Sequence, residues 1–266
     1  MVSDDQVLAS IKSIIDNAKT QYKTDVSITQ RNSIPDTKLI PIENQNNWLK
    51  IPKVISIFVD MRGSTKLSAS SYDKSTARIY QLFTGTAVKI FNEFNSPYVD
   101  VRGDGVLALF NGNQVHRALA VAVTFHTFCR EEFVSLVKKT GLDIGSHIGI
   151  DMRTVLVRKI GIKRHQGRSD RQNEVWAGRP VNMSSKLANE AKDNEVLVSD
   201  RFFSSLKSRY ALRSCGCPDD KVIDLWSEKD LSEDDRFDFN TAYVLKSIWC
   251  KNHGANFCRE LLNSDD

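Results

Sequence analysis

Val54-Ile55-Ser56-Ile57-Phe58-Val59-Asp60 decides the fold, because it reads as an apolar strand that ends on a carboxylate. Side chains alternate along a strand, so Ile55, Ile57 and Val59 point to one face while the residues between them, with Asp60, point to the other. The first set predicts the face that helices cover. The second set places a carboxylate on the opposite face, at the end of the strand.

The elements that follow this strand predict an α+β fold. The hydrophobic pattern indicates a helix, two strands, a second helix and a further strand, over residues 74–95, 97–103, 105–110, 114–139 and 142–151, the last continuing as a strand or hairpin to about 162. Gly103-Asp104-Gly105 marks a tight turn between the two middle strands. The order β-α-β-β-α-β is that of a ferredoxin-like antiparallel sheet with helices on one face.

The rest of the chain predicts additions at both ends. Residues 3–20 have the apolar spacing of an amphipathic helix, and residues 21–52 carry three prolines in a polar stretch that predicts a linker. We therefore expect an N-terminal helix and linker (1–52), a main domain (53–228) and a C-terminal helical extension (229–266).

Composition excludes several classes of protein. No run approaches the roughly 18 consecutive apolar residues that cross a membrane, and residues 1–6 do not lead into a signal-type apolar core. We therefore expect no membrane association and a cytoplasmic location. A net charge of +4 is too weak to indicate nucleic-acid binding. The five cysteines are odd in number and sparse, which predicts reduced thiols.

Two carboxylates are candidate metal ligands. Asp60 ends the first strand, and Asp104 sits in the turn of the neighbouring hairpin, so the two can be close in space. Carboxylate oxygens suit Mg²⁺ or Mn²⁺. The alternative is that Asp104 only serves its turn and Asp60 only caps the following loop.

A second group of polar residues lies in Glu174-Val175-Trp176-Ala177-Gly178-Arg179-Pro180-Val181-Asn182-Met183-Ser184-Ser185-Lys186. This stretch predicts a turn that opens a helix at Pro180. Asn182 and Lys186 are four residues apart, so an amide and a cation project from one helix face. An exposed polar face without a function is the alternative.

Together these motifs resemble the class III nucleotidyl cyclase family over roughly residues 54–228, and most closely the pyrimidine nucleotide cyclases of bacterial anti-phage signalling. The resemblance implies that the main domain is the catalytic domain. It implies that Asp60, Asp104 and the backbone carbonyl of Met61 bind two Mn²⁺ or Mg²⁺ ions per active site. Asn182 is then expected to orient the ribose and Lys186 to contact the α-phosphate in the transition state.

The same resemblance implies a substrate, a partner and a set of nucleotide-binding residues. The substrate is UTP or CTP, converted to 3′,5′-cyclic UMP or cyclic CMP and pyrophosphate in a head-to-tail homodimer, and the product acts on a separate cyclic-nucleotide-binding effector. An adenylyl or guanylyl cyclase, or a non-catalytic nucleotide-sensing dimer, are the alternatives. The expected nucleotide-binding residues are Phe58, Gly63, Ser64, Thr65, Asp100, Glu174 and Trp176.

Three departures from the family pattern leave details open. Lys186 stands where most members carry arginine, which keeps the charge but loses the bidentate fork. A triphosphate-binding lysine is missing near Ser214-Cys215-Gly216-Cys217, and Lys221 or a basic residue of the 158–171 loop could replace it. Asp100 stands where adenylyl cyclases carry lysine and guanylyl cyclases glutamate. The sequence therefore leaves UTP and CTP both open, with a slight preference for UTP.

Sulfur and imidazole groups near the C-terminus raise a separate question. Cys215-x-Cys217, Cys250-x-x-His253 and Cys258 supply enough ligands for a zinc site, although their spacing is not a standard one. The alternative is a set of buried thiols near a C-terminal helix whose Trp249 and Phe257 pack on the catalytic domain.

Overall fold

The structure, a computed structural model, describes residues 8–40, 46–162, 171–193 and 195–265. Its centre is a sheet in which neighbouring strands follow the order β3-β4-β2-β5. This is the strand order of a ferredoxin-like β-α-β-β-α-β unit, so the predicted fold class is confirmed. The four strands are β2 (Asn47–Arg62), β3 (Tyr98–Arg102), β4 (Gly105–Phe110) and β5 (Gly145–Ile162).

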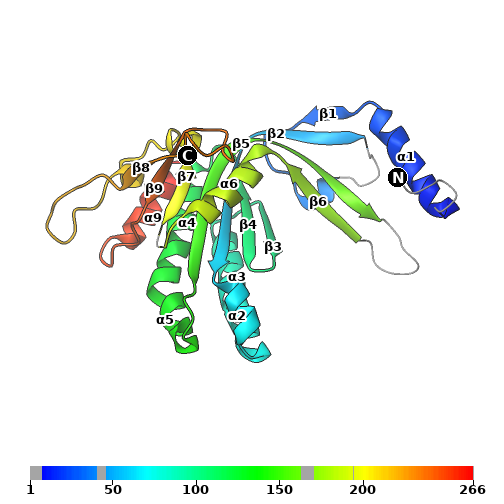
Figure 1. Cartoon of the computed structure of the whole chain (residues 1–266). Coiled ribbons are helices and arrows are strands. Elements are labelled where there is room, and N and C mark those ends of the chain that lie inside the picture. Colours follow the sequence, from blue (N-terminus) through cyan, green and yellow to red (C-terminus); the bar gives the residue numbers. More distant parts are fainter. Residues whose placement is uncertain (1–7, 41–45, 163–170, 194, 266) are drawn as a thin grey trace.

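Helices that follow β2 and β4 form a layer over one face of this sheet (Figure 1). The predicted helix over 114–139 is interrupted, because α4 passes into a π-helical turn at Cys129–Phe133 before a last helical turn. The elements of this layer are α2 (Ser64–Ser70), α3 (Asp73–Glu93), α4 (Val115–Phe128), α5 (Val134–Val137) and a 3₁₀ turn at Lys138–Thr140.

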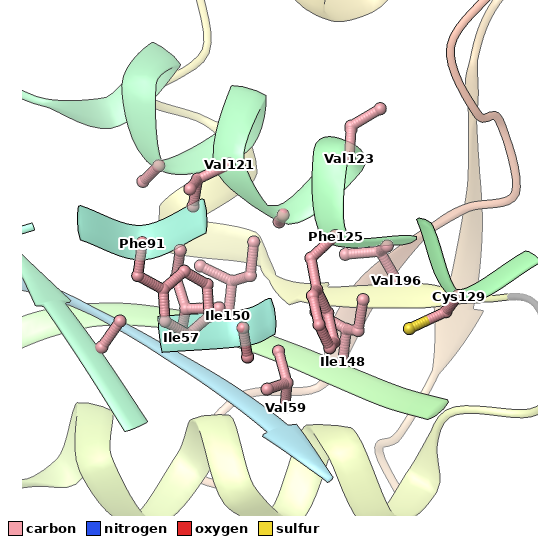
Figure 2. Close-up of a cluster of buried hydrophobic side chains, with 14 of the residues drawn as sticks. Ile57, Val59, Phe91, Val121, Val123, Phe125, Cys129, Ile148, Ile150 and Val196 are labelled. Carbon is pink, nitrogen blue, oxygen red and sulfur yellow. The ribbon is translucent and has the colours of Figure 1, made fainter. Parts of the chain in front are cut away.

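The main hydrophobic core lies between these helices and the sheet (Figure 2). Ile57 and Val59 of β2 are fully buried beneath α4, as the strand alternation predicts. The ring of Phe83 on α3 lies 5.2 Å from those of Phe125 and Phe133, centroid to centroid. These apolar contacts join both helices to the sheet and supply the main driving force for folding.

The opposite face of the sheet is not free of helices, which corrects the expectation that helices lie on one face only. Helix α6 (Arg179–Glu190) crosses it over β2 and β5. The Oγ atoms of Ser56 and Ser184 lie 2.7 Å apart and both serines are fully buried. Gly149 permits this approach, since a Cβ atom there would stand 2.0 Å from the backbone oxygen of Ser184.

Residues 21–52 are not the irregular linker that their prolines predict. Strand β1 (Ser27–Gln30) pairs in parallel with the start of β2, and a 3₁₀ turn follows at Thr37–Leu39. Pro52 lies inside β2, at a register shift between Ile51 and Val54. Such a bulge tolerates proline because the ladder hydrogen bond is interrupted there. The predicted domain boundary at residue 53 therefore falls within a strand.

The long strand β5 continues past the domain and pairs with β6 (Arg171–Ala177) to form an arm (Figure 1). Up to Ile162 the chain is one continuing strand, which is one of the two forms that the sequence left open. The N-terminal helix α1 (Ala9–Lys23) lies beyond β1, whereas the prediction began it at residue 3, outside the described residues. Its apolar residues Ile11, Ile14 and Ile15 are exposed.

The C-terminal part is not purely helical as expected. Strands β8 (Trp226–Asp230) and β9 (Thr241–Leu245) extend the sheet through β7 (Val196–Ser199), so the boundary predicted at 228 also falls within a strand. Short helices α7 (Asp200–Phe203) and α8 (Arg209–Leu212) precede them. Helix α9 (Gly254–Asn263) then packs against α4, and the carboxylate of Asp265 accepts hydrogen bonds from the backbone N–H groups of His116 and Arg117 at 2.8 and 2.7 Å.

Within the described part of the chain, no helix has the length and apolar character that crossing a membrane requires.

Candidate active site

The polar face of the sheet arranges several predicted site residues in rows across the strands. Phe58 lies opposite Leu107 of β4, and Leu107 lies opposite Asp100 of β3. Two residues further along β2, Asp60 lies opposite His147 of β5. Residues opposite each other in adjacent strands point to the same face. Asp100, Phe58 and Asp60 therefore share the face that the strand alternation predicts.

Asp60 and Asp104 come together at the end of this face. Burial and, to a smaller extent, the negative charge of Asp104 raise the pKa of Asp60 to about 6, against the opposing effect of a hydrogen bond from the backbone of Met61. Two carboxylates that interact in this way repel each other, and a bound cation would relieve the repulsion. The approach of β4 is close, because a Cβ atom on Gly105 would stand 3.4 Å from Oδ1 of Asp60.

The donor set at this position fits a divalent cation. Two carboxylates with a nearby backbone carbonyl are the hard oxygen ligands that Mg²⁺ and Mn²⁺ prefer. The negative charge of Asp104 contributes to the raised pKa of Asp60, so the two carboxylates lie near enough to interact electrostatically. The structure brings these residues together. Metal binding by Asp60, Asp104 and the carbonyl of Met61 stays a prediction.

Gly63, Ser64 and Thr65 follow directly where β2 turns into α2. Gly63 has φ of +83° at the N-cap of that helix, in the left-handed region that glycine favours. A Cβ atom on it would stand 2.5 Å from the backbone oxygen of Asp143. The tight turn therefore needs glycine, and it places the start of α2 four residues after Asp60.

Asn182 and Lys186 lie on α6, as predicted. The helix presents Ser184, Leu187 and Ala188 to the sheet, and Asn182 is exposed. Among the described residues, no hydrogen bond or ion pair joins Asn182 or Lys186 to Asp60 or Asp104. Lys186 Nζ donates instead to the backbone oxygen of Arg236 at 2.6 Å.

The loop of Arg236, to which Lys186 donates, is fixed by ion pairs that the sequence analysis did not predict. Asp238 accepts hydrogen bonds from Arg179 at 2.7 Å, from Arg153 at 3.0 Å and from Arg201 at 3.0 Å. Arg201 also binds Asp151 through two hydrogen bonds of 2.7 and 2.6 Å, and Asp151 is fully buried. No short-range signal marks this network, because its members come from distant segments.

A second cluster forms around Tyr98 on β3. Its ring centroid lies 4.8 Å from that of Trp176, one of the predicted nucleotide-binding residues, which is buried. Burial raises the pKa of Tyr98 above its usual range, and the negative charges of Asp100 and Glu174 add to the shift. The structure thus brings Asp100, Glu174 and Trp176 together around one phenol ring.

Two residues of this cluster were missed by the sequence analysis. Arg102 donates from Nε to Asp100 at 2.7 Å, and Thr37 donates its hydroxyl proton to Glu174. The alternation of β3 could have identified Arg102, since it faces the same side as Asp100. Strand alternation does not identify Thr37, because the prolines of its segment predict a linker.

The basic candidates for the triphosphate are less well placed. Lys221 lies in the loop that carries Cys215 and Cys217 and lines a pocket there. Of the 158–171 loop, Arg164 and Arg168 lie outside the described residues. Arg158 is placed with its guanidinium 5.5 Å from the ring centroid of Trp48. The residue that binds the triphosphate remains a prediction.

Comparison with known sequences finds similar curated proteins but no matching family model. The chain is 38% identical over 232 residues, 84% of its length, to a uridylate cyclase from Propioniciclava tarda, of which it covers 73%. It is 31% identical to a uridylate cyclase from Micromonospora echinofusca, with 85% of this chain and 74% of the relative covered. A cytidylate cyclase from Staphylococcus aureus is 26% identical over 69% of this chain and 44% of its own length.

Solved structures share the fold at lower sequence identity. The guanylyl cyclase Cya2 superposes with a TM-score of 0.59 at 18% identity, over 75% of this chain and 93% of that one. The adenylyl cyclase CyaB from P. aeruginosa gives a TM-score of 0.58 at 17% identity, over 74% of this chain and 95% of that one. The fold is thus that of the class III cyclases, and the chain belongs to the pyrimidine nucleotide cyclase family of nucleotidyl cyclases.

Proposed function

We propose that this protein is a uridylate cyclase that converts UTP to 3′,5′-cyclic UMP and pyrophosphate. The observation that carries the proposal is the convergence of Asp60 and Asp104 at the end of a class III cyclase sheet. The two curated relatives with the highest identity given above are uridylate cyclases, which supports uracil over cytosine as the base.

The reaction needs no nucleophile from the protein. The ribose 3′-hydroxyl loses its proton to water as its oxygen attacks the α-phosphorus. The bond from that phosphorus to the bridging oxygen breaks, and pyrophosphate leaves with the electron pair. Asp60 and Asp104, with the carbonyl of Met61, would hold two Mg²⁺ or Mn²⁺ ions. Such ions, when bound, lower the pKa of the attacking hydroxyl and offset charge on the departing pyrophosphate.

The side chains of α6 have the complementary task. Asn182 positions the ribose so that the 3′-oxygen stays close to the phosphorus, and Lys186 offsets the charge on the non-bridging oxygens of the α-phosphate. Both side chains lie on one helix, and within the described chain neither forms a hydrogen bond or ion pair with Asp60 or Asp104. This separation supports a head-to-tail homodimer in which one protomer supplies the carboxylates and its partner the α6 residues.

The cluster around Tyr98 is suited to recognise the base. Asp100 and Glu174 offer carboxylate oxygens that accept a proton from N3–H of uracil, while the guanidinium of Arg102 can donate to a carbonyl oxygen of the same base. The ring of Phe58 is positioned beside Gly105 and gives the sugar an apolar surface. We assign Gly63, Ser64 and Thr65 to the phosphates, because they follow Asp60 directly.

The proposal is tested by incubating the protein with Mn²⁺ and each of ATP, GTP, CTP and UTP, and identifying products by mass spectrometry. We expect cyclic UMP from wild-type protein and none from Asp104→Asn, whose side chain keeps its size but loses the charge that binds cations. A purine product would move the protein to the adenylyl or guanylyl cyclases. Absence of any product under all four conditions would favour a non-catalytic nucleotide-sensing dimer.

A change at Asp100 tests base recognition separately from catalysis. Asp100→Ala is expected to lower kcat/KM for UTP about 10- to 100-fold, because a hydrogen bond to a charged group contributes roughly 1.5–3 kcal/mol. Inhibition by tripolyphosphate should not change, since that ligand has no base. The matched control is Val101→Ala, a change at an exposed residue whose side chain points to the other face of the same strand. An equal loss of tripolyphosphate binding would show that Asp100 acts on the site as a whole.

We further propose that the cyclic nucleotide is a messenger for defence against phage, produced in the cytoplasm and detected by a separate effector protein. The support is membership of the pyrimidine nucleotide cyclase family. In addition, the sequence of residues 173–186 resembles that of the family's anti-phage members. The proposal predicts that Asp104→Asn abolishes protection of cells that also carry the effector.

A further inference from the structure

Four metal-binding side chains meet outside the candidate active site, between the loop before β8 and the start of α9. They are Cys215, Cys217, Cys250 and His253, whose ligand atoms all lie within 4.8 Å of one another. The sulfur atoms of Cys217 and Cys250 lie 3.3 and 3.6 Å from Nδ1 of His253. In a tetrahedral zinc site, with Zn–S of about 2.3 Å and Zn–N of about 2.0–2.1 Å, sulfur and nitrogen ligands are about 3.5 Å apart.

We propose that Cys215, Cys217, Cys250 and His253 bind one structural Zn²⁺ ion through three thiolates and one imidazole. A Cys₃His set fills all four tetrahedral positions, and closed sites of this kind are structural. No position is left for a substrate or a reactive water. The proposal is therefore independent of UTP cyclisation and of the cations expected at Asp60 and Asp104.

The backbone around Cys250 forms a turn that places its side chain beside that of His253. The carbonyl oxygen of Cys250 accepts from the N–H groups of His253 and Gly254 at 3.2 and 2.8 Å, which closes a tight turn at the start of α9. A thiolate is the form in which cysteine binds a metal.

The other two sulfurs are presented by a closed loop. Gly216 lies between them with φ of +91°, and its carbonyl oxygen accepts from the N–H of Lys221 at 3.0 Å. The N–H of Ser214 donates to the backbone oxygen of Ile223 at 2.9 Å, which closes the loop at its base. These backbone bonds hold the loop in a shape that presents both sulfurs.

Cys258 is not part of the cluster, although it was among the possible ligands in the sequence. Its sulfur is 3.9 Å from Oγ1 of Thr124 in a partly buried position, and burial raises its pKa to about 11. Trp249 and Phe257 pack against the main core, as the alternative interpretation expected. That interpretation is wrong about Cys215 and Cys217, which are exposed and not buried thiols.

The proposed ion joins two parts of the chain that otherwise meet through packing. One pair of ligands lies between α8 and β8, and the other directly precedes α9, which packs on α4 through the buried Leu261. A metal that binds the folded protein stabilises it, because the unfolded chain does not hold the four ligands together.

The test is the metal content of protein purified under reducing conditions with no polyhistidine tag and no chelator. We expect about one zinc per chain in wild type and in Cys258→Ser, and less than about a tenth of that in Cys217→Ser and Cys250→Ser, which lose a thiolate ligand. Equal zinc in all four proteins would contradict the assigned ligands. Zinc bound at Asp60 and Asp104 is distinguished by Asp104→Asn, which should keep the full amount.

A second measurement uses wild-type protein, so it tests the proposal even if the cysteine variants fail to fold. Wild-type protein exchanged into Co²⁺ should show thiolate-to-cobalt charge transfer and the absorption bands of tetrahedral cobalt. Protein with all five thiols reduced but no zinc or cobalt bound would overturn the proposal. So would an intact mass two hydrogens lower, with a disulfide that joins two of Cys215, Cys217 and Cys250. None of these readouts depends on cyclase activity.

Discussion

Mixing Asp60→Ala protein with Lys186→Ala protein is expected to restore about a quarter of wild-type activity, because random exchange makes half the dimers hybrid and each hybrid has one intact site. Alone, Asp60→Ala should lose at least about 10³-fold in kcat, since it removes a ligand of the cations, which contribute several kcal/mol of transition-state stabilisation. Lys186→Ala should lose about 10²- to 10³-fold, the usual effect of removing one group that stabilises developing charge.

The measurement is cyclic UMP formation as a function of the ratio of the two variants. A maximum at equal amounts is the expected signature of shared sites. The double variant Asp60→Ala/Lys186→Ala, mixed with wild type, is the control, because with shared sites each hybrid has one site without Asp60 and one without Lys186 and should be inactive. Failure to recover activity, when subunit exchange is demonstrated with a labelled chain, would show that each site is complete within one protomer.

Asp151→Ala is expected to destabilise the protein by about 3–5 kcal/mol. Asp151 is fully buried, and both of its oxygens accept from Arg201, whose side chain is 19% exposed. Removing the carboxylate leaves this cation without its main partner. For a chain of this size the loss corresponds to a fall of roughly 6–20 °C in Tm, which thermal unfolding would measure.

Two further variants separate the buried pair from its neighbours. Arg153→Ala removes a partner of Asp238 that is 48% exposed, so it should cost less than about 1 kcal/mol. The double variant Asp151→Leu/Arg201→Met should recover most of the stability, because apolar residues can replace a buried ion pair. Asp238 keeps Arg179 and Arg153 in that variant. A double variant as unstable as Asp151→Ala would assign the loss to packing.

The part of the fold that the sequence predicts well is governed by local periodicity. The alternation of Ile57 and Phe58 identifies both faces of β2, and the turn at Gly103 fixes the neighbouring hairpin. The convergence of Asp60 and Asp104 follows from these two features alone. Each signal lies within one strand or one turn, so no knowledge of distant segments is required.

The features that the sequence does not predict depend on contacts between distant segments. Gly149 brings α6 against the sheet, but a glycine within a strand does not say which element approaches it. Asp238 meets three arginines that come from β5, α6 and α7. The four zinc ligands come from two loops whose unusual spacing matches no standard motif. Tertiary structure alone brings these groups together.

The continuity of β2 gives the molecule a mechanical property. One strand runs from the pairing with β1 at Asn47 to the carboxylate at Asp60, and it is bonded to β5 along most of that length. A hydrogen-bonded strand resists stretching, so a pull on the N-terminal segment reaches Asp60 as a displacement along the strand axis. The bulge around Pro52 is the weakest point of this strand, because the ladder of hydrogen bonds is interrupted there. The arm and Asp60 are thus connected through the continuous backbone of one strand.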